Sequence, residues 1–130
     1  MRTIAIDLGL KRIGLAYSPD GVMVTPLPAI ERRNRDQAAR DVAAQIKAWD
    51  AQQVVIGIPI GGSSEEEMRR RVAHFMNLVN FEGPVLYQDE SDSSLEAEAL
   101  MKGAIDYRRD GRIDSLSAMI ILRRFLGIVF

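Results

Sequence analysis

Three acidic residues stand at places where a carboxylate is costly to bury. Asp7 interrupts the apolar run from Ile4 to Leu8, Glu90 ends a second apolar segment, and Asp114 precedes an apolar helical pattern. An unpaired buried carboxylate costs more free energy than one strand gains by burial, so a cation, a metal ion or several donors must compensate it. The three acids therefore form a candidate metal site.

Carboxylate oxygens are the ligands that hard divalent cations such as Mg²⁺ prefer, together with water and phosphate oxygens. Two such ions about 3.5 to 4 Å apart can activate a water and stabilise the leaving oxygen in an in-line attack on phosphorus. This chemistry needs no histidine or cysteine nucleophile, which suits a chain with one His and no Cys. The acids thus favour metal-dependent hydrolysis of a phosphate ester.

Each acid also has a structural interpretation. Asp7 could be a turn acid, Glu90 a solvated strand end, and Asp114 only the N-cap of the last helix. Asp110 is an alternative to Asp114 as third ligand, but Gly111 between them suits a turn that ends before the helix. Only the convergence of the three acids favours a metal site over these separate roles.

The first half of the chain predicts a β-meander and a helix. Strands are expected at Thr3 to Leu8, Ile13 to Ser18 and Val22 to about Ala29, because short connections such as Pro19-Asp20-Gly21 demand antiparallel neighbours. Asn34 and Gln37 form a capping box for a helix whose apolar stripe ends at Trp49, which we expect in the core.

The second half predicts alternating strands and helices. Buried strands are expected at Val54 to Pro59 and Pro84 to Glu90. Capping boxes (Ser63 with Glu66 or Ser64 with Glu67, and Ser93 with Glu96) begin two helices, and a final amphipathic helix follows Asp114. The order is three antiparallel strands and then αβαβα. It predicts an α/β fold with a five-stranded mixed sheet, in which ligands gather near the carboxyl ends of the parallel strands.

Composition limits the class of protein. The 130 residues suit a single domain over 1–130, and 47% hydrophobic residues with 27% charged ones are typical of a soluble globule. No apolar run is long enough to cross a bilayer, and the first strand leaves no room for a signal peptide, so we expect a cytoplasmic protein without membrane contact.

A net charge of -1 means that a nucleic acid would be held by local basic patches. The candidate binding residues are Lys11, Arg12, Ser63, Arg108 and Arg112, with Ser63 in a glycine-rich loop that could cradle a phosphate. Arg32, Arg33 and Arg35 form another basic group. The run Arg69 to Arg71 is more typical of a solvated helix face, and His74 of a partly exposed structural residue.

Four motifs resemble those of the YqgF family, also called RuvX or Holliday-junction-resolvase-like proteins. They are Ile4-Ala-Ile-Asp-Leu-Gly-Leu-Lys-Arg-Ile-Gly14, Val55-Ile-Gly-Ile-Pro59 with Gly62-Ser63, Asp89-Glu90 with Ser93-Ser94, and Asp114-Ser-Leu-Ser-Ala-Met-Ile-Ile-Leu122. The match is collinear and covers nearly the whole chain.

This resemblance implies an RNase H-like fold with helices on both faces of the sheet, and a nuclease dependent on Mg²⁺ or Mn²⁺. It places the family's catalytic, metal-binding acids on Asp7, Glu90 and Asp114. In bacteria the family is associated with processing the 5′ end of pre-16S rRNA, so the implied partners are pre-rRNA and ribosomal precursor particles, or branched DNA. Monomer and homodimer both stay open.

The sequence departs from the family pattern at Ser91, where Arg is usual, and at Asp92, where an apolar residue is usual. Without that Arg the chain needs another cation to bind a phosphate, and Arg12, Arg108 or Arg112 could substitute.

Three other functions fit parts of the sequence. A Holliday-junction resolvase would use the same chemistry on DNA. A catalytically degenerate nucleic-acid- or ribosome-binding module is favoured by the departures at Ser91 and Asp92 but opposed by three intact acids facing phosphates. A sugar-kinase or actin-like ATPase half also has an Asp-Leu-Gly strand, but 130 residues leave no second lobe to enclose a nucleotide.

Overall fold

The computed structural model describes residues 1–91, 99 and 111–128. Its five strands are β1 (Thr3–Leu8), β2 (Arg12–Ser18), β3 (Thr25–Glu31), β4 (Gln53–Ile58) and β5 (Val85–Asp89). The helices of the described part are α1 (Arg35–Ala48), α2 (Glu65–Val79) and α4 (Gly111–Leu126). The helix that we expect after Ser93 lies outside the described residues, as do Arg108 and Asp110.

The sheet has the strand order β3-β2-β1-β4-β5. β1 pairs antiparallel with β2 and β2 antiparallel with β3, whereas β4 lies parallel to both β1 and β5. This confirms the predicted mixed sheet, in which a meander is followed by two crossovers. Because β1, β4 and β5 are parallel, their carboxyl ends meet at one edge of the sheet.

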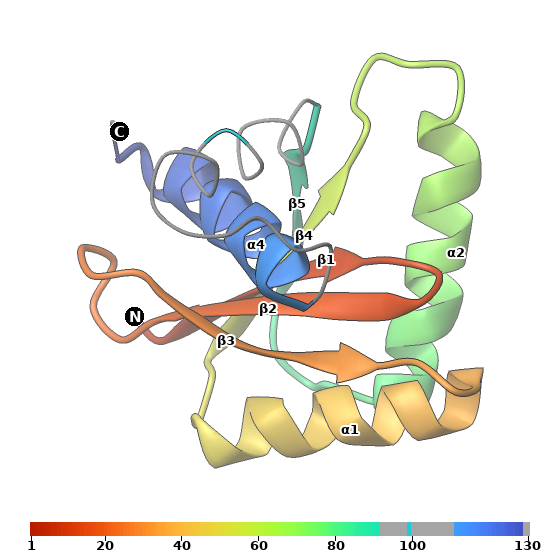
Figure 1. Ribbon diagram of the computed structural model, residues 1–130, viewed down its shortest axis with the longest axis horizontal. Helices are drawn as coiled ribbons and strands as arrows, with labels where there is room; N and C mark the ends of the chain where they lie inside the picture. The colour runs from red at the N-terminus through yellow and green to blue at the C-terminus, as the bar shows by residue number, and fades with distance from the viewer. Residues whose placement is uncertain (92–98, 100–110, 129–130) are drawn as a thin grey trace.

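Helices cover both faces of the sheet, as predicted (Figure 1). On one face, side chains of alternate positions such as Ile4 and Ile6 pack with α1 and α2 in the larger core. On the other face, Ala5, Ala16 and Val55 pack against α4 in a smaller core. Strand side chains alternate between faces, so Asp7 shares the α4 face with Ala5 and Leu8 shares the opposite face with Ile6.

The start of α1 is as predicted. The Asn34 side chain accepts a hydrogen bond from the Gln37 N–H at 2.7 Å, and the Gln37 side chain accepts one from the Asn34 N–H at 3.2 Å. This reciprocal capping box is local, which explains why the sequence was sufficient to predict it.

Two local predictions differ from the structure. The third strand begins at Thr25 rather than Val22, because the Asp20 carboxylate accepts hydrogen bonds from the Val22 and Met23 N–H groups and prolongs the turn. Trp49 is not in the core: it is 41% exposed at the C-cap of α1, with its ring tilted by 37° against that of Tyr17 and the ring centroids 4.8 Å apart.

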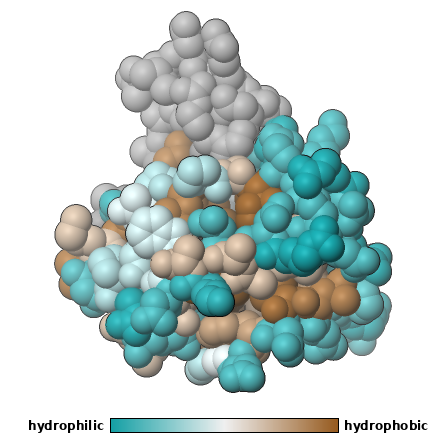
Figure 2. Space-filling model, turned by 90° about the horizontal axis from the view of Figure 1, so that it is seen from below, coloured by the Kyte–Doolittle hydropathy of each residue, from teal (hydrophilic) through white to brown (hydrophobic). Residues whose placement is uncertain are grey.

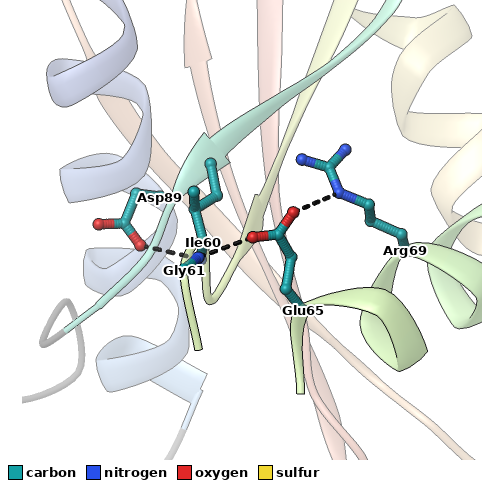
Figure 3. A network of polar contacts seen from close by, with 5 residues as sticks. All are labelled: Ile60, Gly61, Glu65, Arg69 and Asp89. Carbon is teal, nitrogen blue, oxygen red and sulfur yellow. Dashed lines mark hydrogen bonds and ion pairs between the residues drawn. The ribbon is translucent and has the colours of Figure 1, made fainter. Parts of the chain in front are cut away.

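The capping boxes predicted for α2 are wrong. α2 begins at Glu65, and its N-cap Ser64 makes no side-chain capping hydrogen bond. Instead the Glu65 carboxylate accepts a hydrogen bond from the Gly61 N–H at 2.7 Å and is held by Arg69 at 2.8 Å (Figure 3). In the described part of the chain, no helix has the length and apolar character needed to span a membrane.

Candidate functional site

The three candidate acids come from three elements that meet at the carboxyl edge of the parallel strands. Asp7 lies near the end of β1, opposite Gly14 of β2. Glu90 directly follows β5, and its N–H donates to the Ile58 carbonyl oxygen at 2.9 Å. Asp114 lies in the first turn of α4 rather than at its N-cap. Electrostatic interactions link Asp7 to both of the other acids, so the structure brings all three together.

Two glycines make room for this arrangement. A Cβ atom built on Gly57 of β4 would lie 3.0 Å from the Glu90 Oε2 atom, so only a glycine lets that carboxylate lie over the strand. A Cβ atom on Gly14 would overlap the backbone carbonyl of Asp114. The first turn of α4 therefore rests directly on β2, next to the strand position that pairs with Asp7. An isolated glycine within a strand signals such a close approach, and this signal could have identified both positions from sequence.

Replacing Gly14 with Ala is expected to destabilise the protein by about 1–3 kcal/mol, because the new methyl group must push α4 away from β2. Gly62→Ala is the matched control, since its Cβ atom would meet nothing closer than the Pro59 carbonyl oxygen at 3.8 Å. Chemical denaturation of both variants measures the difference. Equal stabilities would mean that α4 does not depend on the close approach to Gly14.

The carboxyl groups of Asp7 and Glu90 share a partly buried site. Burial above all, and then the charge of Asp114, raises the pKa of Asp7 to about 6, against the opposing effect of its hydrogen bond with Glu90. Burial, the charge of Asp7 and their hydrogen bond together raise the pKa of Glu90 to about 8, with Asp89 adding a smaller effect. Near neutral pH the pair therefore holds one proton, shared between its two carboxyl groups.

Asp114 is compensated by a cation. The Arg12 Nε donates to the Asp114 Oδ2 at 2.8 Å, and both side chains are about three-quarters buried. Arg12 therefore lies beside the acids and orients one of them, which the sequence did not predict.

The chemistry of the donor set fits a hard divalent cation. All donors are carboxylate oxygens, and the two that share a proton stand where a cation could replace that proton. Among the described residues, no three acidic or histidine side chains lie close enough together to hold a metal ion. The Asp114 carboxylate is turned toward Arg12, so Asp114 could act as a third ligand only if its side chain rotated toward Asp7 and Glu90.

Asp89, the neighbour of Glu90, has a structural role. It accepts hydrogen bonds from the Ser91 hydroxyl at 2.8 Å, the Ser91 N–H at 3.2 Å and the Ile60 N–H at 3.2 Å, the last drawn in Figure 3. The bonds from Ser91 come first among the causes that lower the pKa of Asp89. The loop after β4 is thereby tied to the end of β5, which fixes the backbone that carries Glu90.

Of the remaining candidate nucleic-acid-binding residues, the structure describes the side chains of Lys11 and Ser63. Lys11 and Ser63 are exposed, Lys11 in the β1–β2 turn and Ser63 in the loop before α2. Arg112 belongs to the first turn of α4, but its side chain lies outside the described part, as does Arg108. Sequence reasoning missed Arg124 of α4, which donates to the Ser91 carbonyl oxygen at 2.8 Å and so places a guanidinium beside Ser91.

Comparison with known proteins agrees with the family resemblance found in the sequence. The family model for RuvX, described as Holliday junction resolvase, matches residues 1–127. A protein of Sulfurimonas denitrificans named "Putative pre-16S rRNA nuclease" is 70% identical over 126 residues, which are 97% of each chain. A protein of Campylobacter lari with the same name is 46% identical over 129 residues, covering 98% of this chain and 99% of the relative.

Solved structures share the fold at low sequence identity. RuvC of T. thermophilus in complex with a Holliday junction substrate is 14% identical, with a TM-score of 0.56 and coverage of 98% of this chain and 96% of that one. The Fowlpox virus resolvase in complex with Holliday junction DNA is 13% identical, with a TM-score of 0.56 and coverage of 98% and 97%. These likenesses show a RuvC-like RNase H fold, in agreement with the predicted fold class.

Proposed function

Since the chain belongs to the RuvX family of nucleases, we propose that it is a divalent-metal-dependent endonuclease that processes the 5′ end of pre-16S rRNA. The observation that carries this proposal is the meeting of Asp7, Glu90 and Asp114 at the carboxyl edge of the parallel strands. A protein that only bound nucleic acid would gain nothing from carboxylates facing phosphates, because they repel the backbone.

Asp7 and Glu90 are the proposed primary ligands of Mg²⁺ or Mn²⁺, since they already share one proton in a common site. Asp114 is the proposed third ligand, a role for which its side chain would rotate from Arg12 toward the pair. When bound, the cation would activate water and neutralise charge that develops on the phosphate oxygens. Arg12 provides a guanidinium at the same edge, where it could contact a phosphate as well as Asp114.

RNA is the proposed substrate because the relatives at 70% and 46% identity carry the name of a pre-16S rRNA nuclease. A ribosomal precursor particle would then be the natural partner. The second candidate is a four-way DNA junction, which the family description and the substrates of the RuvC and Fowlpox structures favour. Both candidates use the same acids and the same phosphodiester chemistry.

Cleavage by the wild-type protein tests the proposal. An end-labelled RNA that spans the 5′ end of 16S rRNA and a labelled DNA four-way junction are each incubated with Mg²⁺, with Mn²⁺ or with chelator. We expect cleavage of the RNA at a defined position, only when metal is present, and little cleavage of the junction.

Preferential cleavage of the junction would replace the RNA substrate with branched DNA and leave the nuclease chemistry intact. Binding of either substrate without cleavage, by protein that melts cooperatively, would contradict the proposal and favour a catalytically degenerate binding module. Cleavage that persists in chelator would contradict the metal dependence.

A further inference from the structure

A basic cavity lies on the other face of the sheet from the three acids. It has a volume of about 240 Å³ and opens between the β1–β2 turn, the segment before α1, and α2. Figure 1 shows these segments on one side of the molecule, with the β1–β2 turn reaching toward α2. Figure 2 views the molecule from the side on which α1 lies, where hydrophilic residues cover most of the surface and hydrophobic ones show between them.

Four of the side chains that line the cavity are basic: Arg32, Arg35, Arg71 and His74. None of them forms an ion pair with a carboxylate anywhere in the described part of the chain. By contrast, Arg69 and Arg70, next to Arg71 on α2, pair with Glu65 and Glu66 one turn earlier. The cavity thus gathers cations from α1, α2 and the segment between β3 and α1 without compensating them.

These cations are held in place by contacts with neutral groups. The Arg32 Nη1 donates to the Gly9 carbonyl oxygen at 3.0 Å, and its guanidinium lies 5.8 Å from the centroid of the Phe75 ring. The Arg35 Nη1 lies 3.0 Å from the His74 Nε2. Because arginine can only donate, the His74 Nε2 atom is the acceptor in this hydrogen bond.

The grouping of like charges has an energetic consequence. Burial of Arg32, followed by the charges of Arg71 and Arg35, lowers the pKa of its guanidinium. An anion inside the cavity would remove this repulsion and accept hydrogen bonds from several preorganised donors at once. Arginine forks match the oxygens of a phosphate better than those of a smaller anion.

We propose that this cavity binds a backbone phosphate of the nucleic acid whose cleavage site lies at Asp7, Glu90 and Asp114. Leu8 lines the cavity and is the neighbour of Asp7 in β1, so the two sites lie on opposite faces of the same strand end. A nucleic-acid strand that passes around the β1–β2 turn would meet both the cavity and the three acids. The assignment of the phosphate to a nucleic acid rests on the proposed nuclease function.

The cavity offers phosphate-binding donors but no free phenyl ring for a base. Phe75, which lines it, is 2% exposed and already has Arg32 over its ring. Base stacking on Phe75, which would need a free ring face, is therefore excluded. The cavity should anchor the strand without regard to sequence, as phosphate contacts do.

A pair of matched double variants tests the proposal. Arg35→Gln with Arg71→Gln removes two cations of the cavity, while Arg40→Gln with Arg70→Gln removes two exposed cations from the same helices outside it. Affinity for a fluorescent RNA hairpin with a single-stranded 5′ extension is measured by anisotropy in chelator, so that no cleavage occurs. We expect the cavity variant to bind at least about tenfold more weakly. The slope of log K against log salt should fall by about 0.7 to 0.9 for each phosphate that the variant no longer neutralises.

Equal losses of affinity in the two double variants would overturn the proposal, because they would show only a diffuse charge effect. The assay reads binding rather than cleavage, so an inactive protein that shows the expected difference would contradict the nuclease function and leave the phosphate site standing. Thermal melting of each variant establishes that it is folded.

The single histidine of the chain gives an independent readout in the wild-type protein. We expect the imidazole NMR signals of His74 to shift on addition of the RNA, because a phosphate would compete with Nε2 for the Arg35 donor. Inorganic phosphate is titrated in parallel. Shifts with inorganic phosphate and none with RNA would overturn the nucleic-acid assignment in favour of a free phosphate ligand, and no shift with either would overturn the site.

Discussion

Asp7→Asn is expected to lower the rate of metal-dependent cleavage by about a thousandfold, equivalent to about 4 kcal/mol of transition-state stabilisation. The amide keeps the shape of the side chain but removes the charge that would bind a divalent cation, and Asp7 is the acid that interacts with both Glu90 and Asp114. Single-turnover cleavage of the preferred substrate, with wild type and variant at equal metal concentration, measures the effect.

The control for this experiment is Asp36→Asn, which removes an exposed carboxylate from the first turn of α1 and should leave the rate within about twofold. Glu90→Gln should be as damaging as Asp7→Asn, and the double variant little worse than either, because ligands of one metal act as a unit. Retention of the wild-type rate by Asp7→Asn would remove this carboxylate from the mechanism. Additive losses in the double variant would argue against a common metal site.

The metal-free protein is expected to lose stability as the pH rises from about 4 to about 8. Asp7 and Glu90 have folded-state pKa values of about 6 and about 8, above their ordinary values of 3.8 and 4.5. Between the ordinary and raised values the folded state binds more protons than the unfolded state. Stability from this pair is therefore fully present below the ordinary pKa values and is lost as the pH rises through the raised ones.

The loss should amount to about 1–3 kcal/mol after allowance for partial solvent screening of the pair. Urea denaturation in chelator at several pH values measures it. Glu90→Gln is the matched variant, since a neutral amide in place of the carboxyl removes the titration of Glu90, the group with the larger rise in pKa, and leaves that of Asp7. Its stability should fall less over the same range.

Saturating Mn²⁺ or Mg²⁺ should reverse the pH trend. A cation binds the deprotonated carboxylates and competes with the shared proton, so the rise in melting temperature on adding metal should grow with pH. A metal effect that is independent of pH, or equal in wild type and Glu90→Gln, would contradict the assignment of Asp7 and Glu90 as ligands.

The sequence by itself determined the elements whose signals are local. The apolar run within Thr3–Leu8 and the capping box of Asn34 and Gln37 depend on neighbours within a few residues, and both appear as predicted. Some local signals failed because a distant partner competed. The Trp49 ring is set beside Tyr17, 32 positions earlier in the chain, and the backbone before α2 is held through Asp89 as well as Glu65.

The sequence also determined the edge of the sheet at which the acids should gather, because strand order follows from connection length and handedness. The resemblance to the RuvX family identified the same residues, and their catalytic and metal-binding roles stay a prediction for the experiments above.

The tertiary structure alone decided which charges are compensated. Arg12 and Asp114 are 102 positions apart, and their ion pair exists only because Gly14 lets α4 rest on β2. The basic cavity depends in the same way on the packing of α1 and α2 beside the β1–β2 turn, which brings Arg35 and His74 together across 39 positions. Periodicity in a sequence specifies which face of an element is buried, whereas the partners of a charged side chain depend on how those faces come together in space.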